Sequence, residues 1–278
     1  MQLSIVVSTH QARFNAVAFK GNLTANVSQI AALGYDGVEL AIRDPRLVDP
    51  AEILQVMSEH HLAAPAIGTG QAWGEEKLSF TDPDAAVRRA AIGRLESHIP
   101  VARQLEAVII VGLIRGIGGR SSARKEEKWL IEALQRCADK ALAQGVKIAV
   151  EPLNRYESTL INTVSQGLVM IEKVGADNLG LLLDTFHMNI EEPSIGDSIR
   201  AGRDKIFHFH VADSNRWYPG AGHLDFTGIL DTLFKTGYNG FVSGEFMPLP
   251  DAAVSAARAI EYLRSLKLGN TGSNMVDP

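Results

Sequence analysis

The sequence is poor in cysteine. Cys137 is the single cysteine in 278 residues, which excludes an internal disulfide framework and suits a reducing compartment. It lies in "ALQRCADKAL" (133–142), a stretch with helical periodicity, where a small buried hydrophobe is expected rather than a nucleophile. Neither a disulfide scaffold nor cysteine catalysis is therefore predicted.

Long apolar runs and basic runs are also missing. No stretch approaches the ~18–20 apolar residues of a membrane span, and the opening "MQLSIVVSTH" lacks the basic flank of a signal peptide. The formal net charge is -5, without a Lys/Arg run, which argues against a nucleic-acid partner. These absences predict a cytoplasmic protein that acts on neither membranes nor nucleic acids.

What the sequence does have is one pattern repeated eight times. Short apolar runs end in Gly, Pro or polar residues, and amphipathic stretches with helical spacing separate them. Alternating strands and helices are typical of parallel strands joined by crossovers. The predicted strands lie at 3–9, 37–42, 62–70, 107–113, 147–154, 179–187, 206–213 and 240–246.

Eight such units without a break in composition predict an α/β fold, a single-domain (β/α)8 TIM barrel over residues 1–268, followed by a flexible tail at 269–278. A doubly wound open sheet is the alternative. That fold usually carries a glycine-rich turn after its first strand, and "VVSTHQARF" has none.

Four consecutive strands in the second half end in residues that bind metals. In such barrels the active-site groups lie at the carboxyl ends of the strands. If these four side chains face the barrel interior, strand alternation places mostly apolar neighbours on the outward face. The four residues are Glu151, Asp184, His210 and Glu245.

Three carboxylates and one imidazole around a shared axis would repel one another without a cation. With one, they form an oxygen-rich site suited to Mn2+, Mg2+ or Co2+. Taken singly, any of these acids could instead cap a helix or pair with a base. His187 is interpreted either as a substrate ligand or as a loop histidine, and His208 as a residue behind the site.

Several blocks of the chain resemble a known family. "EPLNRYE", "LDTFHMNIEE", "HFHVADSNRW", "GHLDF" and "GEF" resemble the D-tagatose 3-epimerase group of the xylose isomerase-like barrels. "AFKGNL", "ELAIRDPRLVDP", "IGTGQAW" and "VGLIRG" look most similar to the branch containing 5-keto-L-gluconate epimerase. The resemblance implies a homo-oligomer that acts on a small keto-sugar.

The same resemblance implies a mechanism. The four strand-end residues would hold one divalent ion, usually manganese, and a ketose or keto-sugar acid would bind it through its C2 and C3 oxygens. Glu151 and Glu245 would remove and return the C3 proton on opposite faces of a cis-enediolate. His187 and Arg216 would stabilise charge on the C2 oxygen, and Glu157 would lie near the first carbons.

Other contacts to the substrate are less defined by the pattern. Arg43, Arg115 and Arg155 follow strand ends, where they could bind a substrate carboxylate or pair with nearby acids. The segment at 68–84 is expected to be a long loop, and its Trp73 is expected either to close over the sugar or to pack on the rim.

Three rival functions share the barrel. An aldose–ketose isomerase or keto-inositol dehydratase would start from the same kind of metal-held enediolate, so the four strand-end residues do not separate them. An endonuclease IV-like nuclease needs further histidines after strands three and four, and "IGTGQAW" and "VGLIRG" contain none. A barrel that has lost activity should show gaps in the ligand set.

Overall fold

The eight apolar runs form eight parallel strands that close into a barrel. A computed structural model describes residues 1–268, in which each strand pairs with the next and β1 pairs with β9. The barrel prediction is therefore confirmed, and an open sheet is excluded. The strands are β1 (Gln2–Ser8), β3 (Gly37–Ala41), β4 (Ala66–Gly68), β5 (Val108–Val111), β6 (Ile148–Val150), β7 (Leu179–Asp184), β8 (Ile206–Val211) and β9 (Phe241–Gly244).

A ninth strand, β2 (Phe19–Lys20), was not predicted. It pairs in parallel with Val7 and Ser8 of β1, beyond the part of β1 that pairs with β9. Two residues are too few for an alternation pattern, so the sequence carried no signal for this strand.

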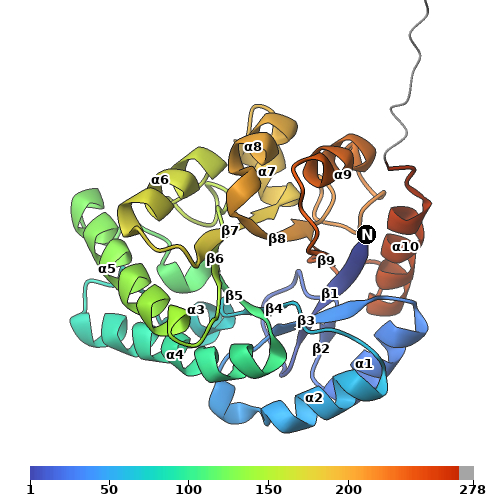
Figure 1. Ribbon diagram of the computed structural model, residues 1–278, viewed down its shortest axis with the longest axis horizontal. Helices are drawn as coiled ribbons and strands as arrows, with labels where there is room; N and C mark the ends of the chain where they lie inside the picture. Colours follow the sequence, from blue (N-terminus) through green and yellow to red (C-terminus); the bar gives the residue numbers. More distant parts are fainter. Residues whose placement is uncertain (269–278) are drawn as a thin grey trace, which may run out of the picture.

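Helices surround the barrel and connect its strands (Figure 1). They are α1 (Leu23–Ala32), α2 (Pro50–Glu59), α3 (Gln71–Glu76), α4 (Ala85–Leu105), α5 (Ala123–Leu142), α6 (Val164–Val174), α7 (Thr185–Glu191), α8 (Ile195–Gly202), α9 (Phe226–Lys235) and α10 (Ala252–Ser265). Short 3-10 turns lie at Pro45–Leu47, Leu113–Arg115 and Arg203–Lys205. Local capping starts several helices, as where Thr163 and Gln166 form a capping box at α6.

The segment at 68–84 differs from the predicted loop, because it contains the helix α3. Trp73 lies on that helix and is half-buried. Cys137 is fully buried in α5, as its helical pattern predicted. Within residues 1–268 no helix is long and apolar enough to cross a membrane. The predicted tail at 269–278 lies outside the described residues.

Two separate hydrophobic clusters show which strand residues face inward. Ala149 and Leu182 belong to a small cluster inside the barrel, together with Ala66 and Ile110. Outward residues such as Val150, Leu183 and Phe209 belong to the large cluster between the sheet and the helices, a set predicted from strand alternation. Residues two positions after Ala149 and Leu182 therefore face the barrel mouth.

Candidate metal centre

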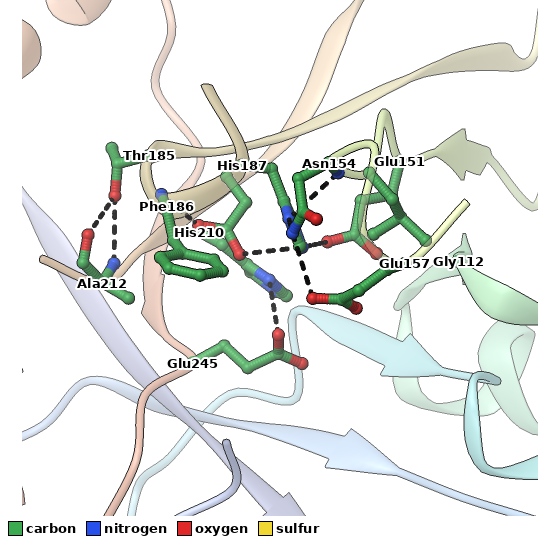
Figure 2. Close-up of polar contacts among 12 residues, drawn as sticks. Gly112, Glu151, Asn154, Glu157, Thr185, Phe186, His187, His210, Ala212 and Glu245 are labelled. Carbon is green, nitrogen blue, oxygen red and sulfur yellow. Dashed lines mark hydrogen bonds and ion pairs between the residues drawn. The ribbon is translucent and has the colours of Figure 1, made fainter. Parts of the chain in front are cut away.

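Four side chains meet at the mouth of the barrel, one from the end of each of the strands β6 to β9. Each offers one ligand atom, and these atoms all lie within 4.8 Å of one another. Figure 2 shows Glu151 and Glu245 approaching His210 from different sides. The structure thus brings together the four residues that the sequence singled out, namely Glu151, Asp184, His210 and Glu245.

The ligand atoms of three of these residues are buried and lack a hydrogen-bond partner among the described residues. They are Glu151 Oε1, Asp184 Oδ2 and His210 Nδ1. A buried polar atom without a partner costs several kcal/mol, roughly 2–7 by transfer measurements. A divalent cation would satisfy all three at once, and a donor set of three carboxylates and one imidazole fits such an ion.

Asp184 combines two tasks that were set out as alternatives. Its Oδ1 accepts a hydrogen bond of 2.8 Å from the backbone N–H of Phe186 and thereby caps α7. Its Oδ2 is left for the shared space. Capping fixes the carboxylate plane, so the helix cap orients the candidate ligand atom.

Burial and mutual repulsion shift the pKa values of this cluster. Burial and the nearby charge of Glu245 raise the pKa of Glu151 well above its ordinary value, and burial raises that of Glu245 to about 7. Burial lowers the pKa of His210, but the charges of Glu39 and the two glutamates outweigh it and raise the value to about 10. Such clustered shifts are typical of functional sites.

His187 lies beside the cluster with one nitrogen directed at it. Its Nε2 is 3.7 Å from Glu151 Oε1 and 3.8 Å from Asp184 Oδ2. Its Nδ1 lies 2.8 Å from Asn154 Nδ2. Because the amide nitrogen donates, Nδ1 accepts, and the ring hydrogen is on Nε2, pointing toward the site. Burial lowers the pKa of His187 well below its ordinary value, which favours this neutral form.

Asn154 is a site residue that sequence reasoning did not single out, although it stands in the quoted block "EPLNRYE". Its Nδ2 also lies 3.1 Å from Glu157 Oε1. Its side chain therefore joins His187 to Glu157, as Figure 2 shows. The position of Asn154, a polar residue shortly after the end of β6, could have marked it as a candidate site residue.

Arg216 and Glu157 form one wall of the site. Arg216 Nη1 lies 2.7 Å from Glu157 Oε1, and Nη2 lies 3.6 Å from Glu245 Oε2. The guanidinium also lies 5.1 Å from the ring centre of Phe14 and 4.7 Å from that of Phe186. These contacts hold a positive charge next to the candidate metal centre.

A cavity of about 310 Å³ is lined by three of the four candidate ligands, Glu151, His210 and Glu245. Apolar side chains make up much of its wall, including Phe14, Val17, Trp73, Leu113 and Leu153. Polar groups gather at its floor. This combination of an apolar wall and a few polar groups is typical of a small-molecule site. Trp73 of α3 is part of the cavity lining.

The arginines expected after strand ends have other partners. Arg115 is fully buried and is absent from the cavity lining; it donates to the backbone carbonyls of Glu151 and, at 2.9 Å, Ile161. Arg155 donates to Glu191, and Arg43 lies 3.6 Å from Glu76. The structure therefore does not bring these three guanidinium groups to the site, because local acceptors already hold them.

Glu39 of β3 is a further residue that the sequence analysis missed as part of the site. Its Oε2 lies 2.8 Å from His208 Nε2 and 2.9 Å from His210 Nε2. Burial raises the pKa of Glu39, but the charges and hydrogen bonds of the two histidines outweigh it, leaving the value below the ordinary one. Alternation within "GVELA" would have revealed an acid on an inward position, since Val38 and Leu40 face outward.

Comparison with known proteins gives a consistent set of relatives. Residues 27–266 match the family model described as xylose isomerase-like TIM barrel. An L-ribulose 3-epimerase from Mesorhizobium japonicum is 34% identical over 235 residues, covering 84% of this chain and 78% of that protein. A ketose 3-epimerase from Arthrobacter globiformis is 30% identical over 249 residues, covering 88% and 84%.

Solved structures of sugar epimerases have the same fold as this chain. A crystal structure of D-allulose 3-epimerase from Methylomonas sp. in complex with D-allulose superimposes with a TM-score of 0.80 at 26% identity, covering 96% of this chain and 98% of that one.

Proposed function

This chain belongs to the xylose isomerase-like TIM barrel family, and from that premise we propose that it inverts C3 of a ketose with the help of one divalent cation. It is an enzyme of the isomerase class that epimerises sugars, in line with relatives that are named L-ribulose 3-epimerase and ketose 3-epimerase. The observation that carries the C3 proposal is that two glutamates, Glu151 and Glu245, belong to one cluster of four groups that could hold a metal ion.

The proposed metal ligands are Glu151, Asp184, His210 and Glu245. Three buried ligand atoms without partners among the described residues support this assignment. The oxygen-rich donor set suits Mn2+, Mg2+ or Co2+, and the family resemblance makes manganese our first choice. When bound, the cation acts as a Lewis acid toward the ketose oxygens and offsets negative charge.

The two glutamates exchange the C3 proton. One carboxylate removes the proton from C3, and the electron pair passes into a cis-enediolate of the substrate. The other carboxyl group then returns a proton to C3 from the opposite face, so no net oxidation occurs.

Two neighbouring groups stabilise the enediolate. His187 directs its Nε2–H at the site, because Asn154 holds Nδ1 from the other side. Arg216 adds a positive charge, which the ring faces of Phe14 and Phe186 keep in place. Both donors are fixed before the reaction, so charge that develops on the C2 oxygen finds them already oriented.

A neutral ketose is the substrate class that the cavity supports best. The two arginines of the cavity lining already face carboxylates, with Arg216 2.7 Å from Glu157 and Arg13 3.5 Å from Glu75. A keto-sugar acid would need a cation to compensate its carboxylate. We therefore propose that the substrate resembles L-ribulose or D-allulose rather than D-tagaturonate.

Deuterium incorporation tests this function. The Mn2+-loaded protein is incubated in D2O with L-ribulose, D-allulose, D-tagatose, D-fructose or D-tagaturonate, and NMR follows the label at each carbon. The proposal expects deuterium at C3 together with a new C3 epimer from a neutral ketose. Label at C1 with an aldose product would instead identify an isomerase, and turnover of D-tagaturonate alone would overturn the neutral-substrate assignment.

A further inference from the structure

A buried carboxylate lies directly behind the candidate metal centre and joins two histidines. Glu39 Oε2 is 2.8 Å from His208 Nε2 and 2.9 Å from His210 Nε2. All three residues are at most 2% exposed. The carboxylate comes from β3 and crosses the barrel interior to reach β8, so it connects the first half of the barrel to the second.

The hydrogen-bond chemistry of this group determines where the His210 ring hydrogen lies. An ionised carboxylate oxygen accepts hydrogen bonds and does not donate them, so both contacts require a hydrogen on Nε2. A cation at the site would take the place of the second ring hydrogen at Nδ1, because Nε2 keeps its own hydrogen toward Glu39. That Nδ1 is buried, lacks a partner among the described residues and is 4.0 Å from Glu245 Oε2. The atom left free is thus the one that faces the other three candidate ligands.

We propose that Glu39 is a positioning residue of the metal centre, which selects the His210 tautomer that presents Nδ1 to the cation and holds the ring in that direction. His208 supports this arrangement from the layer below, because its own Nε2–H fixes the same carboxylate oxygen. The inference rests on the proposed function, since it requires a cation among the four ligands.

The physical reason is that a neutral imidazole can carry its hydrogen on either nitrogen. Without an acceptor at Nε2, part of the His210 population would carry the hydrogen on Nδ1, where it would block the cation. A carboxylate behind a metal-bound imidazole also makes the ring a stronger donor, and loss of such a partner typically costs about 10–100-fold in metal affinity.

Calorimetric titration of the full chain with Mn2+ tests the inference. Glu39→Gln is expected to weaken Mn2+ binding by about 10–100-fold, while the circular dichroism spectrum stays that of the wild type. Glu39→Asp is the second variant, because it keeps the buried negative charge but retracts it from His210. It is expected to weaken binding as well, which keeps the test decisive where Glu39→Gln fails to fold.

Glu126→Gln is the matched control. Glu126 is also a buried glutamate, 2% exposed, and it accepts backbone hydrogen bonds from Gly119, Arg120 and Ser121. It is absent from the cavity lining. Its replacement should lower the melting temperature without changing Mn2+ affinity. The control therefore distinguishes the effect of removing any buried carboxylate from the effect of removing the carboxylate that contacts His210.

A second readout reports the tautomer itself. In 15N-histidine-labelled, Mg2+-loaded protein, the wild type should show an Nε2-bound hydrogen on His210 by NMR, and Glu39→Gln should weaken that signal. Unchanged Mn2+ affinity together with an unchanged Nε2–H signal in a folded Glu39→Gln protein would overturn the inference and leave the metal centre intact. Absence of Mn2+ binding by the wild type would overturn the metal centre itself.

Discussion

The two halves of the barrel differ in what their strands carry toward the mouth. In the second half, β6 to β9 place the four candidate ligands at or near their carboxyl ends. In the first half the corresponding strands end in small or apolar residues, namely Ser8, Ala41, Gly68 and Val111. The second half thus holds the reactive groups, whereas the first half shapes the cavity.

One strand of the first half also carries an acid toward the candidate metal centre. Glu39 is an acid on a strand of the first half, β3, and its Oε2 contacts two histidines of β8. The two halves are therefore connected at the site, because a carboxylate from the first half contacts one candidate ligand of the second, His210.

The largest effect is expected from the second half. Glu151→Gln and Glu245→Gln should each slow C3 proton exchange by about 10²–10⁴-fold, the usual contribution of a general acid or base. Neutral glutamine keeps the side-chain shape but does not accept the proton. Exchange rates in D2O with a ketose substrate provide the measurement, and circular dichroism checks the fold. Wild-type exchange in both variants would rule out the two-carboxylate mechanism.

The second-largest effect is expected from a substitution in the first half that adds a methyl group next to Glu151. A Cβ at Gly112, just after β5, would lie 2.8 Å from Glu151 Oε2. Gly112→Ala should therefore displace that carboxylate and lower kcat by up to about 10²-fold, as misplacement by ~1 Å does. Gly93→Ala in α4 is the matched control, because its Cβ would meet no atom within 4 Å and Gly93 does not line the cavity, and its kinetics should remain those of the wild type.

Removing the partner of His187 should have a smaller effect. Asn154→Ala deletes the side-chain amide that donates to His187 Nδ1 and leaves the longer hydrogen bond of 3.3 Å from the backbone N–H of residue 154, so the ring is held less firmly. One lost hydrogen bond of about 1.4 kcal/mol corresponds to about a tenfold lower kcat/KM. Steady-state kinetics measure it. Asn162→Ala, which removes contacts to backbone carbonyls of Leu153 and Ser158, should reduce thermal stability more than kcat/KM.

The smallest effect is expected at the rim of the first half. The Arg13 side chain is 87% exposed and its Nε lies 3.5 Å from Glu75 Oε2. Exposed ion pairs contribute about 0–1 kcal/mol, so Arg13→Ala should change KM by no more than about fivefold and leave kcat unchanged. A large fall in kcat would show that the first half takes part in the chemistry.

The difference between the halves also explains what the sequence could predict. The four strand-end residues stand out because an acid or histidine interrupts or ends an apolar run, and the barrel brings such ends together. The site roles of Glu39 and Asn154 depend on contacts with residues distant in the chain. The partners of Glu39 are 169 and 171 residues away, and His187 is 33 residues from Asn154. Local sequence patterns do not encode those pairings. The strand β2 and the helix α3 within 68–84 are too short for a strand or helix periodicity to be detected in the sequence.

The roles of individual residues follow the same division. Residues such as Arg115 looked suitable for substrate binding by their position alone. The actual partners of Arg115 are backbone carbonyls, including that of Ile161, whereas Arg155 and Arg43 face carboxylates. These partners can be assigned only once the chain is folded. Strand-end position therefore predicts proximity to the site, whereas burial and competing acceptors decide which side chains face it.

The most direct test of the central claim is an anomalous difference map from crystals of this protein grown with MnCl2, recorded near the manganese absorption edge. One strong peak is expected among Glu151, Asp184, His210 and Glu245, with His210 Nδ1 as its nitrogen ligand. A peak bound elsewhere, or density that lacks manganese at these four residues, would contradict it.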